Sequence, residues 1–228
     1  MGTPLLEGIA EIEELLWEEG QLVGKAIRDA SVAFWERDVA AADAVIAFDD
    51  EIDDHYLRIE QQIPVLLARQ GPLALDLRRV LALLHVNLHL ERIGDYCVTI
   101  AKLARLTAGL PVDPSLEQTL ETMATRAAEI VEAAVAAFFA ADTDAALELV
   151  QRDEAIDVDN RDVVWRVLTL GADKGLHEWG LRMIVVARSL ERIGDHAVDI
   201  GEQTAYLVTG SFHEFTDASH PLVAETRR

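Results

Sequence analysis

Leu-Glu-Arg-Ile-Gly-Asp at residues 90–95 recurs without change at residues 190–195. The match extends beyond this stretch, since Val98 corresponds to Val198. A six-residue identity at this offset indicates that the chain consists of two copies of one unit. Each copy carries a Glu and an Asp four residues apart. On a helix, that spacing places both carboxylates on one face, about 6 Å apart along the axis.

A second acidic motif precedes the first in each copy. Asp-x-x-Ile-Asp occurs at residues 49–53 and again at residues 153–157. Asp50 and Asp54 have the same spacing, but Asp54 corresponds to Val158, so this pair is not repeated. The carboxylate pairs that both copies share are Asp49 with Asp53 and Asp153 with Asp157.

Composition and charge limit the class of protein. The 228 residues are 50% hydrophobic, which excludes a disordered chain. The formal net charge of −21 disfavours direct binding to nucleic acids or anionic lipids and favours cations or partners with basic surfaces. There is one cysteine, Cys97, and no apolar run reaches the roughly 18 residues of a membrane span. We therefore expect a cytoplasmic protein.

The apolar pattern predicts an all-α fold. Apolar residues recur at spacings of three and four, without the alternation of strands. We expect two tandem three-helix bundles, related by a pseudo-twofold repeat and each long enough for its own core. Pro64 is expected to kink or fray the second helix, and Pro72 to be the first residue of the third. The predicted helices span about residues 6–36, 39–69 and 72–109, then begin near residues 115, 143 and 173, the last ending near residue 210. The predicted domains are residues 1–110 and 111–210, followed by a short, mobile tail at residues 211–228.

The repeated carboxylates predict cation sites. With 41 acidic residues in the chain, one such pair is expected by chance, so the signal is two pairs on two helices in both copies. Neighbouring helices lie about 8–10 Å apart, so facing pairs would gather four negative charges around one small volume. An all-oxygen site of this kind suits hard ions such as Mg²⁺, Ca²⁺, Mn²⁺ or Fe³⁺.

An ordinary structural role is the alternative. Arg92 and Arg192 could pair with the aspartates of the preceding helices, which would make the carboxylates ordinary interhelical ion pairs or solvated faces. Gly94 and Gly194 indicate a close approach, because glycine inside a helix costs roughly 1 kcal/mol relative to alanine. Close helix packing is the favoured cause, ahead of a metal cluster or a partner.

The histidines do not follow the repeat. His85 and His89 have no histidine at the matching positions of the second copy, and His196 corresponds to Tyr96. We therefore interpret His85 and His89 as packing or surface residues, and His196 as outside any shared site. No Cys or His belongs to the repeated pattern, which argues against a zinc-finger-like site.

The doubled Glu-Arg-Ile-Gly-Asp, each copy preceded by Asp-x-x-Ile-Asp, resembles the PhoU family of phosphate-signalling regulators. Asp76-Leu77-Arg78 also resembles the family's first repeat, and the resemblance covers about residues 10–208. It implies two three-helix bundles in tandem and, in some members, metal ions at the carboxylate motifs, reported as iron or zinc clusters. It also implies a cytoplasmic, non-enzymatic negative regulator that connects a phosphate ABC transporter with a sensor histidine kinase.

Carried onto this chain, the resemblance assigns two metal sites, with iron, zinc, Mg or Mn as the candidate ions. Asp199 stands where many members have Asn, and would add charge to the second site. We expect a homodimer that contacts the transporter's ATPase subunit and the kinase, and that reaches the membrane only through these partners. A metal-dependent hydrolase or a metal-storage protein remains the alternative. The first site comprises Asp49, Asp53, Glu91 and Asp95, and the second Asp153, Asp157, Glu191 and Asp195.

Overall fold

The computed structural model describes residues 3–171 and 173–215. Within these residues the chain is helical and has no strand, as the sequence predicts. The helices are α1 Pro4–Trp35, α2 Val39–Gln70, α3 Leu75–Thr107, α4 Pro114–Ala140, α5 Thr143–Leu168 and α6 Lys174–Thr209. Residues 216–228, which make up most of the predicted mobile tail, lie outside the described residues.

Aspartates begin four of the helices. Asp38 and Asp142 precede α2 and α5, and Asp113 and Asp173 precede α4 and α6. Each side chain accepts hydrogen bonds from backbone N–H groups of the first turn, which otherwise have no partner within the helix. Part of the acidity of this chain therefore serves the helix ends rather than the candidate sites.

Two predictions about prolines are corrected. The third helix begins at Leu75 and not at Pro72, because Gly71 adopts a left-handed conformation (φ 53°) that ends α2, and the chain reverses before α3 starts. Of the two effects predicted for Pro64, a kink or fraying, the fraying does not occur, since the residues after it remain helical to Gln70. Pro64 lies on the exposed face of the helix, where the missing N–H leaves no buried group unpaired.

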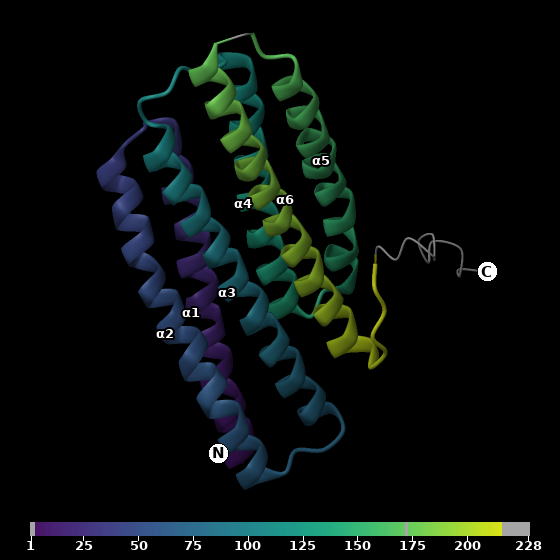
Figure 1. The fold of residues 1–228 in the computed structure, drawn as a ribbon. Helices are drawn as coiled ribbons and strands as arrows, with labels where there is room; N and C mark the ends of the chain where they lie inside the picture. Colours follow the sequence, from purple (N-terminus) through teal and green to yellow (C-terminus); the bar gives the residue numbers. More distant parts are fainter. Residues whose placement is uncertain (1–2, 172, 216–228) are drawn as a thin grey trace, which may run out of the picture.

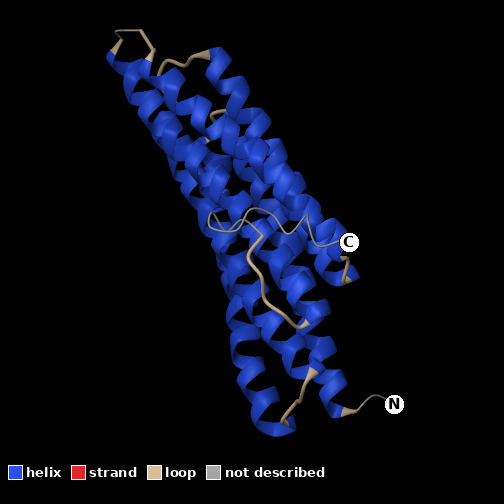
Figure 2. Cartoon of the chain, turned by 90° about the vertical axis from the view of Figure 1, so that its right-hand side faces the viewer, coloured by secondary structure: helices blue, strands red, loops and turns tan. Residues whose placement is uncertain are grey.

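The two repeats lie side by side (Figure 1). Helices α1–α3 form one bundle and α4–α6 the other, and short loops at the bundle ends connect the helices (Figure 2). Contacts between the bundles run from α3 to α6 and from α1 to α4, so α2 and α5 lie on the outer sides. The predicted fold class, two tandem three-helix bundles, is confirmed.

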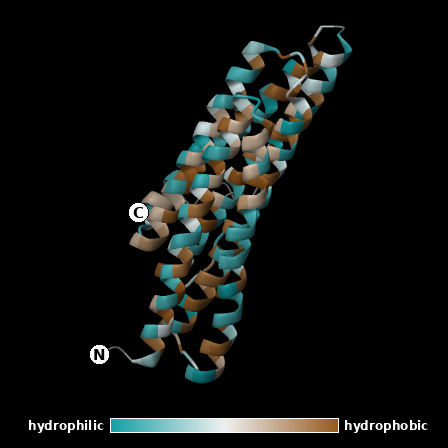
Figure 3. Ribbon diagram, turned by 90° about the vertical axis from the view of Figure 1, so that its left-hand side faces the viewer, coloured by the Kyte–Doolittle hydropathy of each residue, from teal (hydrophilic) through white to brown (hydrophobic). Residues whose placement is uncertain are grey.

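The face of the molecule on the side of α2 carries both hydrophobic and hydrophilic residues along its length (Figure 3). Within residues 3–171 and 173–215, no helix combines the length and the apolar character needed to cross a bilayer.

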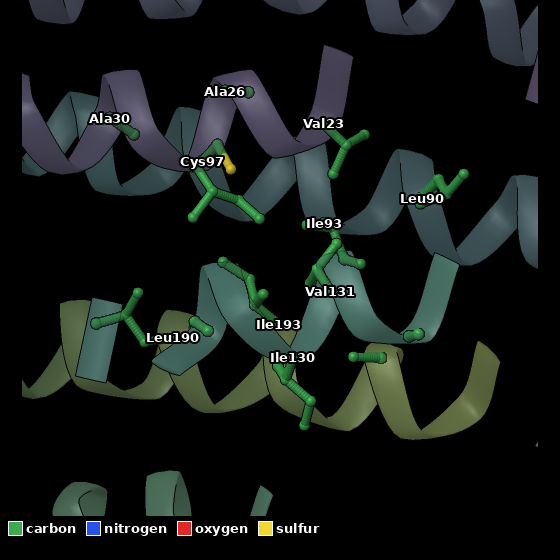
Figure 4. Packing of buried hydrophobic residues seen from close by; sticks show 14 of the residues in the cluster. Val23, Ala26, Ala30, Leu90, Ile93, Cys97, Ile130, Val131, Leu190 and Ile193 are labelled. Atoms are coloured by element: carbon green, nitrogen blue, oxygen red, sulfur yellow. The ribbon is translucent and has the colours of Figure 1, made fainter. Parts of the chain in front are cut away.

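The buried apolar residues of both repeats form one continuous cluster rather than two separate cores. Leu90 and Ile93 of the repeated motif belong to it, together with their counterparts Leu190 and Ile193 (Figure 4). The apolar positions of the motif therefore serve the boundary between the repeats. The acidic positions of the same motif project elsewhere, towards α2 and α5.

Candidate metal centres

The glycine of each repeated motif lies against an aspartate of the neighbouring helix. A Cβ atom added to Gly94 would lie 3.3 Å from Asp49 Oδ1 and 3.3 Å from Ile52 Cδ1. The corresponding atom at Gly194 would overlap Asp153 Oδ1 and lie 3.3 Å from Ile156 Cδ1. In both repeats, glycine thus lets the acidic motif of the second helix pack directly on the motif of the third.

The first cluster comprises Asp49, Asp53, Glu91 and Asp95, and its members influence one another's ionisation. Burial, followed by the charges of Asp53 and Asp95, raises the pKa of Asp49 to about 6. The pKa of Glu91 is raised by burial and then by Asp95, and that of Asp53 by burial and then by Asp95. The four predicted carboxylates of the first repeat therefore lie close enough to influence one another's charge.

The second cluster comprises Asp153, Asp157, Glu191 and Asp195, and it is more deeply buried. Burial, then the charges of Asp195 and Asp157, raise the pKa of Asp153 to about 7. The pKa values of Glu191 and Asp195 are also raised, in both cases mainly by burial. Asp153 and Glu191 are only 8% and 7% exposed, whereas Asp49 and Glu91 are half-buried.

The arginines of the motif pair along their own helices. Arg92 lies 3.0 Å from Asp95 and 3.4 Å from Glu91, and Arg192 makes the matching contacts in α6. Within the part of the chain that the structure describes, neither arginine pairs with an aspartate of α2 or α5, so the predicted alternative of interhelical ion pairs is not what the fold forms. Of the four cluster aspartates on α2 and α5, Asp157 pairs with Arg161 of its own helix, and the other three make no ion pair among the described residues.

The donor atoms of both clusters suit a hard cation by chemical type, although among the described residues no three of these carboxylates offer oxygen atoms within 4.8 Å of one another. All are carboxylate oxygens, the ligands that Mg²⁺, Mn²⁺ and Fe³⁺ prefer. Three of these oxygens, Glu91 Oε2, Asp153 Oδ1 and Glu191 Oε2, are buried and have no hydrogen-bond partner in the described structure. Buried polar atoms normally have a partner, and a bound cation would supply one here.

Glu19 of α1 is a further carboxylate near the first cluster, and the repeated motifs do not predict it. This side chain is fully buried, and neither carboxylate oxygen has a partner among the described residues. Burial, with a smaller contribution from Glu91, raises the pKa of Glu19 to about 9. Comparing the repeats hides this residue, because its counterpart in α4 is Met123. Its place between Leu16 and Val23 on the apolar stripe of α1 is the signal that could have found it.

These features define a class of tandem helical proteins with one carboxylate cluster between the second and third helix of each repeat. The family model of the PhoU domain matches residues 16–104 and 120–204. The chain belongs to the PhoU family, and the family predicted from the two motifs is confirmed.

Curated and solved relatives resemble this chain over most of its length. It is 30% identical over 205 residues to a phosphate-specific transport system accessory protein PhoU homolog of Synechocystis sp., covering 90% of this chain and 91% of that relative. The crystal structure of PhoU from Pseudomonas aeruginosa has a TM-score of 0.85 at 30% identity, covering 90% of this chain and 99% of that one. The crystal structure of the phosphate transport system regulatory protein PhoU from Streptococcus pneumoniae has a TM-score of 0.83 at 27% identity, covering 92% and 99%.

Proposed function

We propose that this protein is a non-enzymatic negative regulator of phosphate uptake and of the phosphate-starvation response. The observation that carries the proposal is that similarity to phosphate-transport accessory and regulatory proteins extends over 90% or more of this chain. In this proposal the protein acts in the cytoplasm as an adaptor. It connects the ATPase subunit of a phosphate ABC transporter with a sensor histidine kinase.

The carboxylate clusters would hold the metal ions of this regulator. Glu91, Glu191 and Asp153 each have a buried oxygen without a hydrogen-bond partner among the described residues, which supports this part of the proposal. A bound iron, zinc, Mg or Mn ion would supply the positive charge that offsets the repulsion among the four carboxylates. Close packing on Gly94 and Gly194 holds the carboxylates of α2 and α5 next to α3 and α6.

Surface charge supports protein partners with basic patches. A net charge of −21 would steer this protein towards positively charged surfaces, and salt would weaken that attraction. We therefore expect the association rate with the ATPase subunit or with the cytoplasmic part of the kinase to fall as salt rises. A homodimer is also part of the proposal.

The direct test is a reporter of the phosphate-starvation response in a strain that lacks this gene. With abundant phosphate, the reporter should be active in the deletion strain and silent when the wild-type gene is restored. Asp53→Asn should restore silencing less well if the first cluster takes part. Asp54→Asn is the matched control, because it removes the same charge one residue away, from a pair that the second repeat lacks.

Two outcomes would contradict the proposal. One is normal silencing in the deletion strain, in the absence of a second gene of the same family. The other is a metal-dependent turnover of phosphate esters by the purified protein, lost in Asp53→Asn but kept in Asp54→Asn. That result would favour the hydrolase alternative.

A further inference from the structure

Three side chains from different repeats converge where α3 packs on α6. His89 comes from the first repeat, and His196 and Asp199 come from the second. The two Nδ1 atoms of the histidines lie 3.0 Å apart, and each lies 3.4 Å from Asp199 Oδ2. All three side chains are partly buried.

The triangle of donor atoms has the size of one metal coordination sphere. Zinc binds histidine nitrogen and carboxylate oxygen at about 2.0–2.2 Å, so two ligands of a tetrahedral ion lie roughly 3.3 Å apart. The circle through the three atoms has a radius of about 1.9 Å, so a point about 2.1 Å from all of them exists just outside their plane. The side chains would need little rearrangement to share an ion.

A hydrogen-bonded cluster without metal explains the geometry less well. One N–H···N bond accounts for the contact between the rings, but 3.4 Å is long for a hydrogen bond from either ring to Asp199. A neutral imidazole has a free lone pair on one ring nitrogen, which can bind a metal ion.

We propose that His89, His196 and Asp199 form a third metal site, which binds Zn²⁺ and links the two repeats. Two imidazoles and one carboxylate suit a borderline transition metal, unlike the all-oxygen clusters. Three protein ligands leave a position for water, and His89 and Asp199 also line an open pocket of about 650 Å³ that can admit it. This site is independent of the proposed regulatory function.

The interpretation of these residues from sequence is thereby revised. From the comparison of the repeats, neither His89 nor His196 is expected to be a ligand, because their counterparts are Ser189 and Tyr96. Asp199 corresponds to Thr99, so no mirror-image copy of this site exists. Asp199 does add charge near Asp195, as expected, but its Oδ2 lies beside the two rings. A site at the boundary between repeats need not follow the repeat.

The test uses the full chain with Zn²⁺ and with Co²⁺ as a spectroscopic probe. Zn²⁺ should shift the ring ¹⁵N NMR signals of His89 and His196, and Co²⁺ should give a visible spectrum of nitrogen ligation that Zn²⁺ abolishes. His89→Ala and His196→Tyr should each weaken binding by more than the roughly 10–100-fold cost of losing an outer-shell partner. His85→Ala is the matched control, since His85 lines the same pocket but is not a ligand.

The ring ¹⁵N signals of the wild-type protein test the proposal even if a variant folds poorly. Asp199→Asn is a further variant, and it keeps the shape of the aspartate side chain. The proposal is overturned if Zn²⁺ leaves both ring signals unmoved. It is also overturned if the folded variants of His89, His196 and Asp199 bind Zn²⁺ as tightly as the wild type. That result would mean that Zn²⁺ binds only at the carboxylate clusters.

Discussion

The two carboxylate clusters occupy the same place in their repeats but differ in their surroundings. Beneath the first lies Glu19, a buried carboxyl whose counterpart near the second cluster is Met123. Beside the second lies Arg188, which donates to Glu191 and has Leu88 as its counterpart. Arg161 of α5 also lies 3.6 Å from Asp157. The second cluster is thus compensated by two additional arginines, whereas the first has Lys102 near Asp49 and an additional acid.

This difference shows that the repeated motif and the residues around it make separate contributions to each cluster. The same four carboxylates recur in both repeats, but their charge balance is set by residues outside the motif. The first cluster has less compensation from protein cations, so it should depend more on a bound metal ion. The second should be closer to balanced without one.

The largest effect is expected from Glu19→Met, which gives the first repeat the residue of the second. A folded-state pKa of about 9 lies above the unfolded value of 4.5, so ionisation of Glu19 opposes folding. The cost is absent below pH 4.5, grows with pH and levels off above pH 9. At pH 7 the variant should gain about 3 kcal/mol in free energy of unfolding. Denaturant unfolding at several pH values, with chelator, measures this.

Glu19→Gln is the control for that experiment. It keeps the size of the side chain but cannot ionise, so it should also flatten the pH dependence between pH 4.5 and 9, with a smaller gain in stability. Wild type and both variants losing stability in parallel over this range would show that Glu19 does not carry a raised pKa.

Hard cations should stabilise the protein, and the clusters should contribute separately. Mn²⁺ at about 100 times its dissociation constant adds about 2.7 kcal/mol per occupied site. Asp95→Asn should remove the contribution of the first cluster and Asp195→Asn that of the second, without unfolding the protein. Melting temperatures with and without Mn²⁺ measure both. A melting temperature that Mn²⁺, Mg²⁺ and iron all leave unchanged in the wild type would argue against occupied sites.

The glycines should differ in their tolerance of alanine. Gly194→Ala should lower the free energy of unfolding by about 1–2 kcal/mol, because the added Cβ overlaps Asp153 and the overpacking exceeds the gain in helix propensity. Gly94→Ala should change it by less than about 0.5 kcal/mol, since Asp49 needs to move only slightly from a 3.3 Å contact. Chemical denaturation of the two variants compares them directly, and equal losses would contradict this ranking.

The smallest effect concerns Arg188 of the second cluster. Arg188→Leu gives α6 the residue of the first repeat and removes a positive charge next to Glu191. The side chain of Arg188 is 48% exposed, so solvent weakens its influence, and Mn²⁺ should bind only a few-fold more tightly. Calorimetric titration measures this, with Arg182→Leu as control because Arg182 pairs with Glu178. Weaker binding of Mn²⁺ by Arg188→Leu would contradict the role of Arg188 as a positive charge that competes with the metal ion.

Much of the fold follows from the repeat alone. Helical periodicity predicts the helices to within a few residues, and comparing the copies selects Asp49 over Asp50 as the residue that faces α3. The start of α3 could not be obtained this way, because a proline after a helix-ending glycine can begin the next helix or belong to the connecting turn. In the structure Pro72 belongs to the turn, and Ala74, with a φ of 49°, precedes the first helical residue, Leu75.

Contacts that break the repeat were harder to predict. Glu19 has an apolar counterpart, so a comparison of copies gives it no weight. His89 and His196 meet only because α3 packs on α6, and no spacing within one repeat encodes the register between two bundles. The repeat therefore predicts what the halves share, and the packing between them determines where they differ.

The continuous core between the repeats has a consequence for how such a chain can change over time. If two identical, separate units shared this boundary, every substitution at it would appear twice and would have to be self-complementary. Joining them in one polypeptide removes that constraint, because each side of the boundary can mutate alone while the other keeps its shape. Unmatched residues such as Glu19 and His196 are accessible only to the fused chain.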